Sequence, residues 1–149
     1  MRHASACALI LSLAITGCLG TSASPDITAT TACGLAPLAR EISTQARAAL
    51  AAARGGDRDA MLDAAQAGRD LVDQIVAAAE AQEPQASLDP LFVPILSVAY
   101  AGEQASSFFG DAVPSAEDLT SFEATILGAL DRSVGRVESE AAAANCPVP

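Results

Sequence analysis

The chain has no lysine and no tryptophan, and its one histidine, His3, lies at the amino terminus. Its eight basic residues are arginines, and eighteen aspartates and glutamates outweigh them to give a formal net charge of −10 at pH 7. This charge repels phosphate backbones and anionic lipid headgroups, so we expect no nucleic-acid partner. This histidine belongs to an amino-terminal segment that is expected to be removed on export, so the mature chain has no histidine for a Ser-His-Asp set or for a histidine-ligated zinc or haem site. The sequence therefore predicts no enzyme, no catalytic residue, no metal and no cofactor.

Aromatic residues are also scarce, at 3% of the chain, whereas alanine supplies 35 of the 149 residues. Alanine has the highest helix propensity, while strands favour β-branched and aromatic residues. A chain of this length forms one compact domain. The composition therefore favours a single, all-helical domain.

An apolar segment from Ala4 to Ile15 follows Arg2 and His3. A basic start, a short apolar run and small residues after it are typical of an export signal. About a dozen apolar residues are too few to cross a bilayer, which takes about 20. The segment therefore predicts export.

The run Ile15-Thr16-Gly17-Cys18 that ends this segment resembles the lipobox of bacterial lipoprotein signals. The resemblance implies that residues 1–17 are a removed signal peptide and that Cys18 carries the lipid. The protein would then lie at the cell membrane or outer membrane, facing the extracytoplasmic side, with residues 18–32 forming the lipidated cysteine and a flexible tether. The alternative is an ordinary signal cleaved near Ala23, which gives a secreted protein without an anchor.

Helical spacing of apolar residues divides residues 33–149 into four helices. Gly55-Gly56 separates the first two, and Asp57 is a suitable N-cap for the second. The predicted buried stripe of the first helix is Leu35, Leu38, Ile42, Ala46, Ala49, Leu50 and Ala53. That of the second is Met61, Ala65, Gly68, Val72, Ile75 and Ala79.

The third helix is predicted to start near Val93 or Pro94, after a loop between Glu83 and Pro90. Pro90 and Pro94 would remove ladder hydrogen bonds, which argues against a strand over Leu91–Ala101. After a turn at Gly110–Pro114, Ser115 and Asp118 resemble a capping box that opens the fourth helix. Its predicted stripe is Leu119, Phe122, Ile126, Leu130, Val134, Val137 and Ala141.

Short connections between four amphipathic helices predict an antiparallel up-down-up-down four-helix bundle. This topology brings the start of the first helix next to the end of the fourth, where Cys33 and Cys146 lie. In an exported chain, two cysteines that bracket a domain predict a disulfide. The alternative is two unrelated thiols.

Two further patterns concern packing between the helices. Arg40, Arg47 and Arg54, spaced by seven, are expected to form surface ion pairs with the acidic face of the second helix. Gly128 and Gly135 share this spacing in the fourth helix and are expected to allow close helix packing.

The resulting functional hypothesis is a lipid-anchored binding or scaffolding module in the bacterial cell envelope. Its expected partners are the membrane, through the lipid at Cys18, and an envelope protein. Phe108 and Phe109 are adjacent, so both cannot face inward from one helix, and with Val113 they form a candidate partner patch. The alternative is that both rings tuck under the connecting loop.

Two other functions compete with this hypothesis. The first is a carrier that holds a small apolar ligand between helices, near Phe92, Leu96 and Tyr100. The second, an enzyme that uses carboxylates alone, ranks last.

Overall fold

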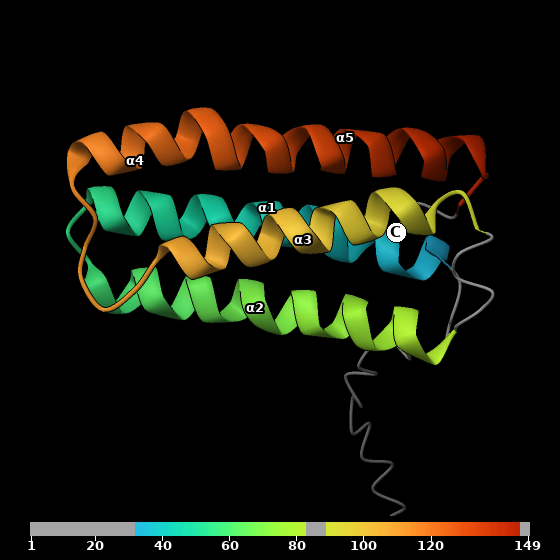
Figure 1. Cartoon of the computed structure of the whole chain (residues 1–149), viewed down its shortest axis with the longest axis horizontal. Coiled ribbons are helices and arrows are strands. Elements are labelled where there is room, and N and C mark those ends of the chain that lie inside the picture. Colours follow the sequence, from blue (N-terminus) through green and yellow to red (C-terminus); the bar gives the residue numbers. More distant parts are fainter. Residues whose placement is uncertain (1–31, 83–88, 147–149) are drawn as a thin grey trace, which may run out of the picture.

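The computed structural model describes residues 32–82 and 89–146, and these two ranges contain helices and turns but no strand. The predicted all-α antiparallel bundle is confirmed (Figure 1). The fourth rod of the bundle consists of three consecutive elements. In chain order the elements are α1 (Ala32–Arg54), α2 (Arg58–Ala81), α3 (Phe92–Phe108), α4 (Ala116–Phe122), the π-helical turn η2 (Glu123–Leu127) and α5 (Gly128–Ala143).

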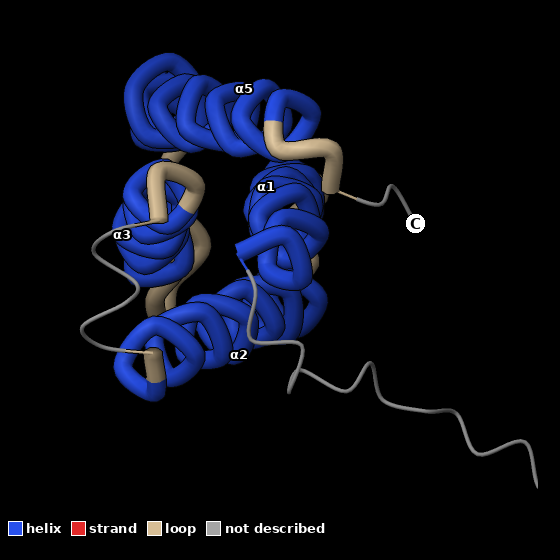
Figure 2. The backbone as a smooth tube through the Cα atoms, turned by 90° about the vertical axis from the view of Figure 1, so that its right-hand side faces the viewer, coloured by secondary structure: helices blue, strands red, loops and turns tan. Residues whose placement is uncertain are grey.

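Seen along its long axis, the bundle has α5 and α2 on opposite sides, with α1 and α3 next to each other between them (Figure 2). Consecutive rods are neighbours, and α5 also packs against α1. Helices α1 and α3 contact each other across the bundle, whereas α2 and α5 lie on opposite sides. The outer surfaces of α2 and α5 therefore face in opposite directions.

The predicted helix starts are confirmed where the structure describes them. The Asp57 carboxylate accepts a hydrogen bond from the backbone N–H of Ala60 at 3.1 Å, after a turn in which Gly56 has φ +72°. The hydroxyl of Ser115 accepts from the N–H of Asp118, whose carboxylate in turn accepts from the N–H of Ser115, both at 3.2 Å. Each arrangement satisfies N–H groups that the first helical turn leaves without a partner.

The segment Leu91–Ala101 is helical and not a strand, as predicted, with α3 starting at Phe92, one residue before the predicted start near Val93. The turn at Gly110–Pro114 is also present. Most of the predicted loop between Glu83 and Pro90 lies outside the described residues. The signal segment 1–17 and the lipobox cysteine, Cys18, also lie outside them. Within the described part, every helix is too short or too polar to span a bilayer.

The core is built mainly from small residues, with a few large side chains between them. All six residues of the stripe predicted for α2 are buried. In α1 the stripe is shifted slightly, because Leu38 is only partly buried while Ala39 and Ser43 are buried. The largest fully buried side chains are those of Phe92, Phe122, Leu35, Ile42, Met61, Ile75, Ile95, Leu127, Leu130, Val98 and Val137.

The stripe predicted for the fourth helix is wrong at one position. Ile126 is only partly buried, and Leu127 takes its place in the core. The reason is η2, in which the N–H of Gly128 donates to the carbonyl of Glu123, five residues earlier. A π turn holds one residue more than an α turn, so the spacing from Phe122 to the next core residue is five instead of four.

Close helix packing occurs at a glycine that the sequence analysis did not single out for it. A Cβ atom on Gly102 of α3 would lie 2.6 Å from Cγ2 of Ile42 and 3.0 Å from Cγ2 of Val72. Gly102 thus allows α3 to approach α1 and α2 at once. The packing role predicted for Gly135 is wrong, because a Cβ there meets nothing within 4 Å, and the nearest atoms to one on Gly128 belong to Arg132 and Glu123 of the same rod.

Candidate functional site

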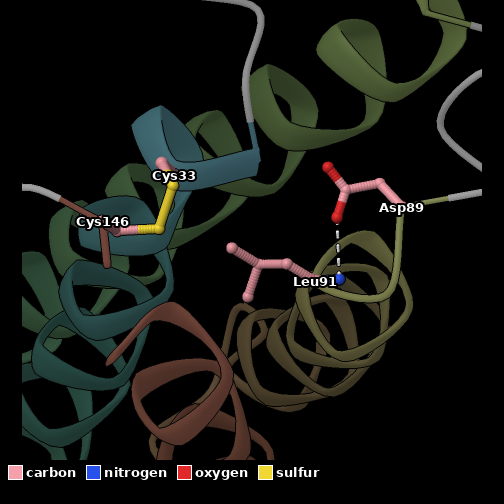
Figure 3. The surroundings of a disulfide bond; sticks show 4 residues. All are labelled: Cys33, Asp89, Leu91 and Cys146. Atoms are coloured by element: carbon pink, nitrogen blue, oxygen red, sulfur yellow. Dashed lines mark hydrogen bonds between the residues drawn. A yellow bond between two sulfur atoms is a disulfide. The ribbon is translucent and has the colours of Figure 1, made fainter. Parts of the chain in front are cut away.

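The predicted disulfide is present at one end of the bundle (Figure 3). The sulfurs of Cys33 and Cys146 are bonded at 2.02 Å, and their Cα atoms lie 5.2 Å apart. Cys33 is the second residue of α1, and Cys146 follows a turn in which its N–H donates to the carbonyl of Ala141 at 2.9 Å. Leu91, next to the first residue of α3, lies beside this bond. The starts of α1 and α3 and the end of α5 therefore share one end of the molecule.

The three arginines spaced by seven in α1 form ion pairs with the fourth rod. Their predicted position opposite the acidic face of α2 is wrong, because this ridge of α1 faces α5 and η2. The pairs are Arg40–Glu138 at 2.9 Å, Arg47–Asp131 at 2.5 Å and Arg54–Glu123 at 2.5 Å. All six side chains are about half exposed, so each pair contributes little to stability. These arginines are occupied by partners within the fold.

Phe108 and Phe109 have a packing role at the other end of the bundle. Phe109 is buried, with 3% of its surface exposed, and Phe108 is partly buried against the core. Both rings contact Phe122, with centroid distances of 4.7 Å and 4.9 Å. Val113 remains exposed. The partner patch at Phe108, Phe109 and Val113 stays a prediction, but no fully exposed ring supports it.

The outward side of α3 is the unusual surface of this protein. Helix α3 is apolar on its buried side, where Ile95 and Val98 are fully covered. Its outer side carries three exposed apolar residues, since Val93 is 56%, Leu96 41% and Tyr100 70% exposed. The other exposed residues of α3 are polar or charged: Ser97, Glu103, Gln104 and Ser107.

A groove of about 560 Å³ runs between this side of α3 and α5. None of the residues that line it is charged. We call this surface the α3–α5 face; its residues are Val93, Leu96, Ser97, Tyr100, Ala101, Gln104, Ala129 and Ser133.

The carrier hypothesis placed Phe92, Leu96 and Tyr100 around one ligand. The structure does not bring them together, because Phe92 is buried in the core while Leu96 and Tyr100 face outward. The sequence carried no signal for this division, since apolar residues occur all around α3.

Two arginines of α5 border the α3–α5 face. Positions 129, 132, 133, 136 and 140 follow helical spacing, so Arg132, Arg136 and Glu140 lie on the side of α5 that carries Ala129 and Ser133. Both arginines are exposed. Within the part of the chain that the structure describes, neither guanidinium forms an ion pair or a hydrogen bond.

Exposed acidic side chains lie on α3 and the fourth rod, at Glu103, Glu117, Glu138 and Glu140, and also along the outer surface of α2. That surface lies on the opposite side of the bundle from α5 (Figure 2). Its exposed acids are Asp59, Asp63, Asp70, Asp73 and Glu80. Across residues 32–82 and 89–146, no group of three or more histidine, cysteine or acidic side chains is placed to hold a metal ion.

Comparisons with protein-family models, with curated proteins and with solved structures find no match to this chain. Its function is therefore inferred from its own residues and their geometry.

Proposed function

We propose that this chain is an exported lipoprotein, anchored through Cys18, and that its disulfide-closed bundle acts as a binding module in the bacterial cell envelope. The observation that carries the proposal is the uncovered α3–α5 face. Leu96, Val93 and Tyr100 expose a contiguous apolar surface beside a groove without charged residues. Apolar patches with a polar rim mark interaction sites on proteins.

The disulfide supports the extracytoplasmic location. Disulfides such as Cys33–Cys146 form and persist in oxidising compartments and are rare in the cytosol. This agrees with the export signal expected over residues 1–17. The alternative is a secreted protein cleaved near Ala23. Its compartment would also be oxidising, so the disulfide does not distinguish it from the anchored form.

A test of the anchor is the intact mass of the protein purified from membranes of its host. We expect a mature chain that begins at Cys18 and carries acyl chains, and a Cys18→Ala variant that lacks the added mass. A mature amino terminus at Ser24 without lipid would refute the anchor and favour the secreted form.

The binding face is tested by photo-crosslinking in living cells. A photoreactive amino acid at position 100 should crosslink to an envelope component, whereas the same residue at position 73, on the acidic side of α2, should not. Equal crosslinking from both positions, or none from position 100, would contradict a binding role of the α3–α5 face.

A carrier of a small apolar ligand is the second candidate. The mostly apolar lining of the groove favours this function, although the groove is wide open to solvent and would leave much of a ligand uncovered. Native mass spectrometry separates the two functions, because a retained small molecule, lost on substitution of Leu96, supports the carrier.

A further inference from the structure

We infer that the α3–α5 face binds a second copy of this chain, in a two-fold dimer that pairs Arg136 of each copy with Glu140 of the other. The inference rests on the proposed function and deepens it, because it names the partner of the exposed face. It is argued from the described residues alone and does not depend on the anchor.

The arginines on α5 differ from the others of the described domain in having no partner. Arg132 and Arg136 form no ion pair or hydrogen bond there, and Glu140, one turn after Arg136, forms no ion pair. The α5 edge of the face thus presents unpaired charges of both signs, as a self-complementary interface requires. The arginines that donate to a carboxylate or a carbonyl within the fold are Arg40, Arg47, Arg54, Arg58 and Arg69.

The charges of Arg136 and Glu140 continue the rows of α5 that line the groove. Arg136 follows Ala129 by seven residues, and Glu140 follows Ser133 by seven. Residues at this spacing lie on nearly the same side of a helix. Both charged residues are exposed, so they lie on the same side of the molecule as the groove.

A two-fold axis that crosses α5 midway between Arg136 and Glu140 makes this strip complementary to itself. The α5 helices of the two copies then run antiparallel. Arg136 of each copy meets Glu140 of the other, which gives two equivalent ion pairs. Arg132 falls opposite Ala144 of the second copy, which is exposed and uncharged.

Two further acids near this axis stay out of the contact. Glu138 is level with the axis, but its side chain is paired with Arg40 of α1 at 2.9 Å. Glu103 is eight residues after Ile95 and therefore lies about 12 Å further along α3 at 1.5 Å per residue. Neither acid brings like charges together across the axis.

The apolar part of the face lies at the level of the same axis. Leu91 lines one hollow with Glu140 and Ala143, so the start of α3 is level with the end of α5. Helices α3 and α5 run in opposite directions (Figure 1). The midpoint of the two charges on α5 is therefore level with Ile95, about one turn after Leu91.

The exposed apolar residues of α3 are placed to meet across this axis. Val93 and Leu96 flank the level of Ile95 and are 56% and 41% exposed. In the two-fold arrangement they pack against the same segment of the second copy, beside the ion pairs. Tyr100 falls opposite Pro90 of the second copy, which is also exposed. The dimer thus covers the three large apolar side chains that the single bundle leaves uncovered.

The dimer is expected to be weak. A standard protein interface buries about 800 Å² on each partner, and the α3–α5 face has only three large exposed apolar side chains. The net charge of −10 also repels two copies at long range. Complementary charges therefore act mainly by selecting this register over others, which makes charge reversal the appropriate test.

The test uses the full chain in living cells. Two versions with different tags are expressed together, and a photoreactive amino acid at position 100 of one version captures the other. The parent chains should give a crosslinked dimer. Arg136→Glu in both versions, or Glu140→Arg in both, should lower the yield of this dimer about tenfold, because each change places like charges together at two symmetric positions.

A mixture of the two variants provides the decisive comparison. Arg136→Glu in one version and Glu140→Arg in the other restore two pairs of opposite charges, so the dimer yield should return to near that of the parent. This rescue also shows that both variants fold. Asp73→Arg is the matched control, since Asp73 is exposed on α2 and the substitution changes the net charge as Glu140→Arg does. It should leave the yield unchanged.

The opposite results overturn the inference. Equal dimer yields from the single variants and from the mixture would exclude the Arg136–Glu140 pairing. Crosslinking of position 100 to a different protein, with no dimer, would contradict the second copy as partner but leave the proposed binding module intact. Absence of any product from position 100 would contradict the binding module as well.

Discussion

Arg54 and Glu123 are ion-paired with 2.5 Å between Nη2 and Oε2. This pair belongs to the ion-pair ladder formed by Arg40, Arg47 and Arg54 with the fourth rod, but its sequence spacing differs by one residue from that of the other two pairs. Arg54 lies seven residues from Arg47, but Glu123 lies eight residues from Asp131, the partner of Arg47. The π-helical turn η2 begins at Glu123 and takes up the additional residue. Both the ion-pair ladder and the apolar stripe therefore continue through the turn without rotating away from α1.

Deletion of the exposed Ala124 from η2 tests this role of the turn. We expect the deletion to be tolerated, because a regular α-helix would then place Phe122 and Leu127 four residues apart. Thermal unfolding followed by circular dichroism should give a midpoint within a few degrees of that of the parent protein.

The matched control removes Gly135, which is exposed; a Cβ atom added there would have no neighbour within 4 Å. This deletion rotates one part of α5 by about 100° relative to the other. Val137 would leave the core, and burial of such a side chain contributes about 1.5–3 kcal/mol. Equal loss of stability from the two deletions would show that η2 does not correct the register.

Loss of the disulfide should destabilise the bundle strongly. Cys33 and Cys146 are separated by 113 positions, and the chain-entropy model assigns about 4–5 kcal/mol to closing a loop of this size. The Cys33→Ser/Cys146→Ser variant, which leaves neither thiol of the pair, should unfold at a much lower denaturant concentration. Parent protein treated with a reductant should approach the same midpoint. An unchanged midpoint in both cases would contradict the prediction.

Gly102→Ala should destabilise the bundle by about 1–3 kcal/mol, the usual cost of overpacking a core. The added Cβ would lie 2.6 Å from Ile42 and 3.0 Å from Val72, and both neighbours are β-branched and stiff at χ1. Gly135→Ala is the control, because its Cβ enters open space and alanine favours a helix by about 1 kcal/mol. Urea unfolding of both variants should give shifts of opposite sign.

The ion-pair ladder should contribute little in comparison. A double-mutant cycle with Arg40→Gln and Glu138→Gln is expected to give a coupling below about 1 kcal/mol, since both side chains are about half exposed. Added salt should reduce the coupling further. A larger coupling that does not depend on salt would mean that the pair is held more rigidly than its exposure indicates.

The buried residues of a helix could be predicted from the sequence where the helix is regular, and not where it is interrupted. The stripe of α2 could be predicted completely, because an uninterrupted helix keeps the period of 3.6 residues from Met61 to Ala79. The stripe of the fourth rod failed at Ile126 because no residue type marks a π turn in advance. The disulfide followed from topology and was confirmed.

The candidate site was harder to foresee than the fold. Arg47 was assigned to the wrong neighbour because acids occur on both helices that flank α1, and spacing alone does not choose between them. The α3–α5 face was missed because α3 has little contrast between its sides. Leu96 and Tyr100 were noticed as candidates, but only the structure shows that they face outward.

The bond between Cys33 and Cys146 also determines how the bundle resists a pulling force. If the chain is anchored through Cys18 as proposed, a force from the anchor would enter the described domain at the start of α1, and the covalent link would pass it to the end of α5. Neither α1 nor α5 could then unfold turn by turn from the end that carries the disulfide. The force instead acts along two neighbouring helices in shear, a direction in which many packed side chains must slide together before the protein opens.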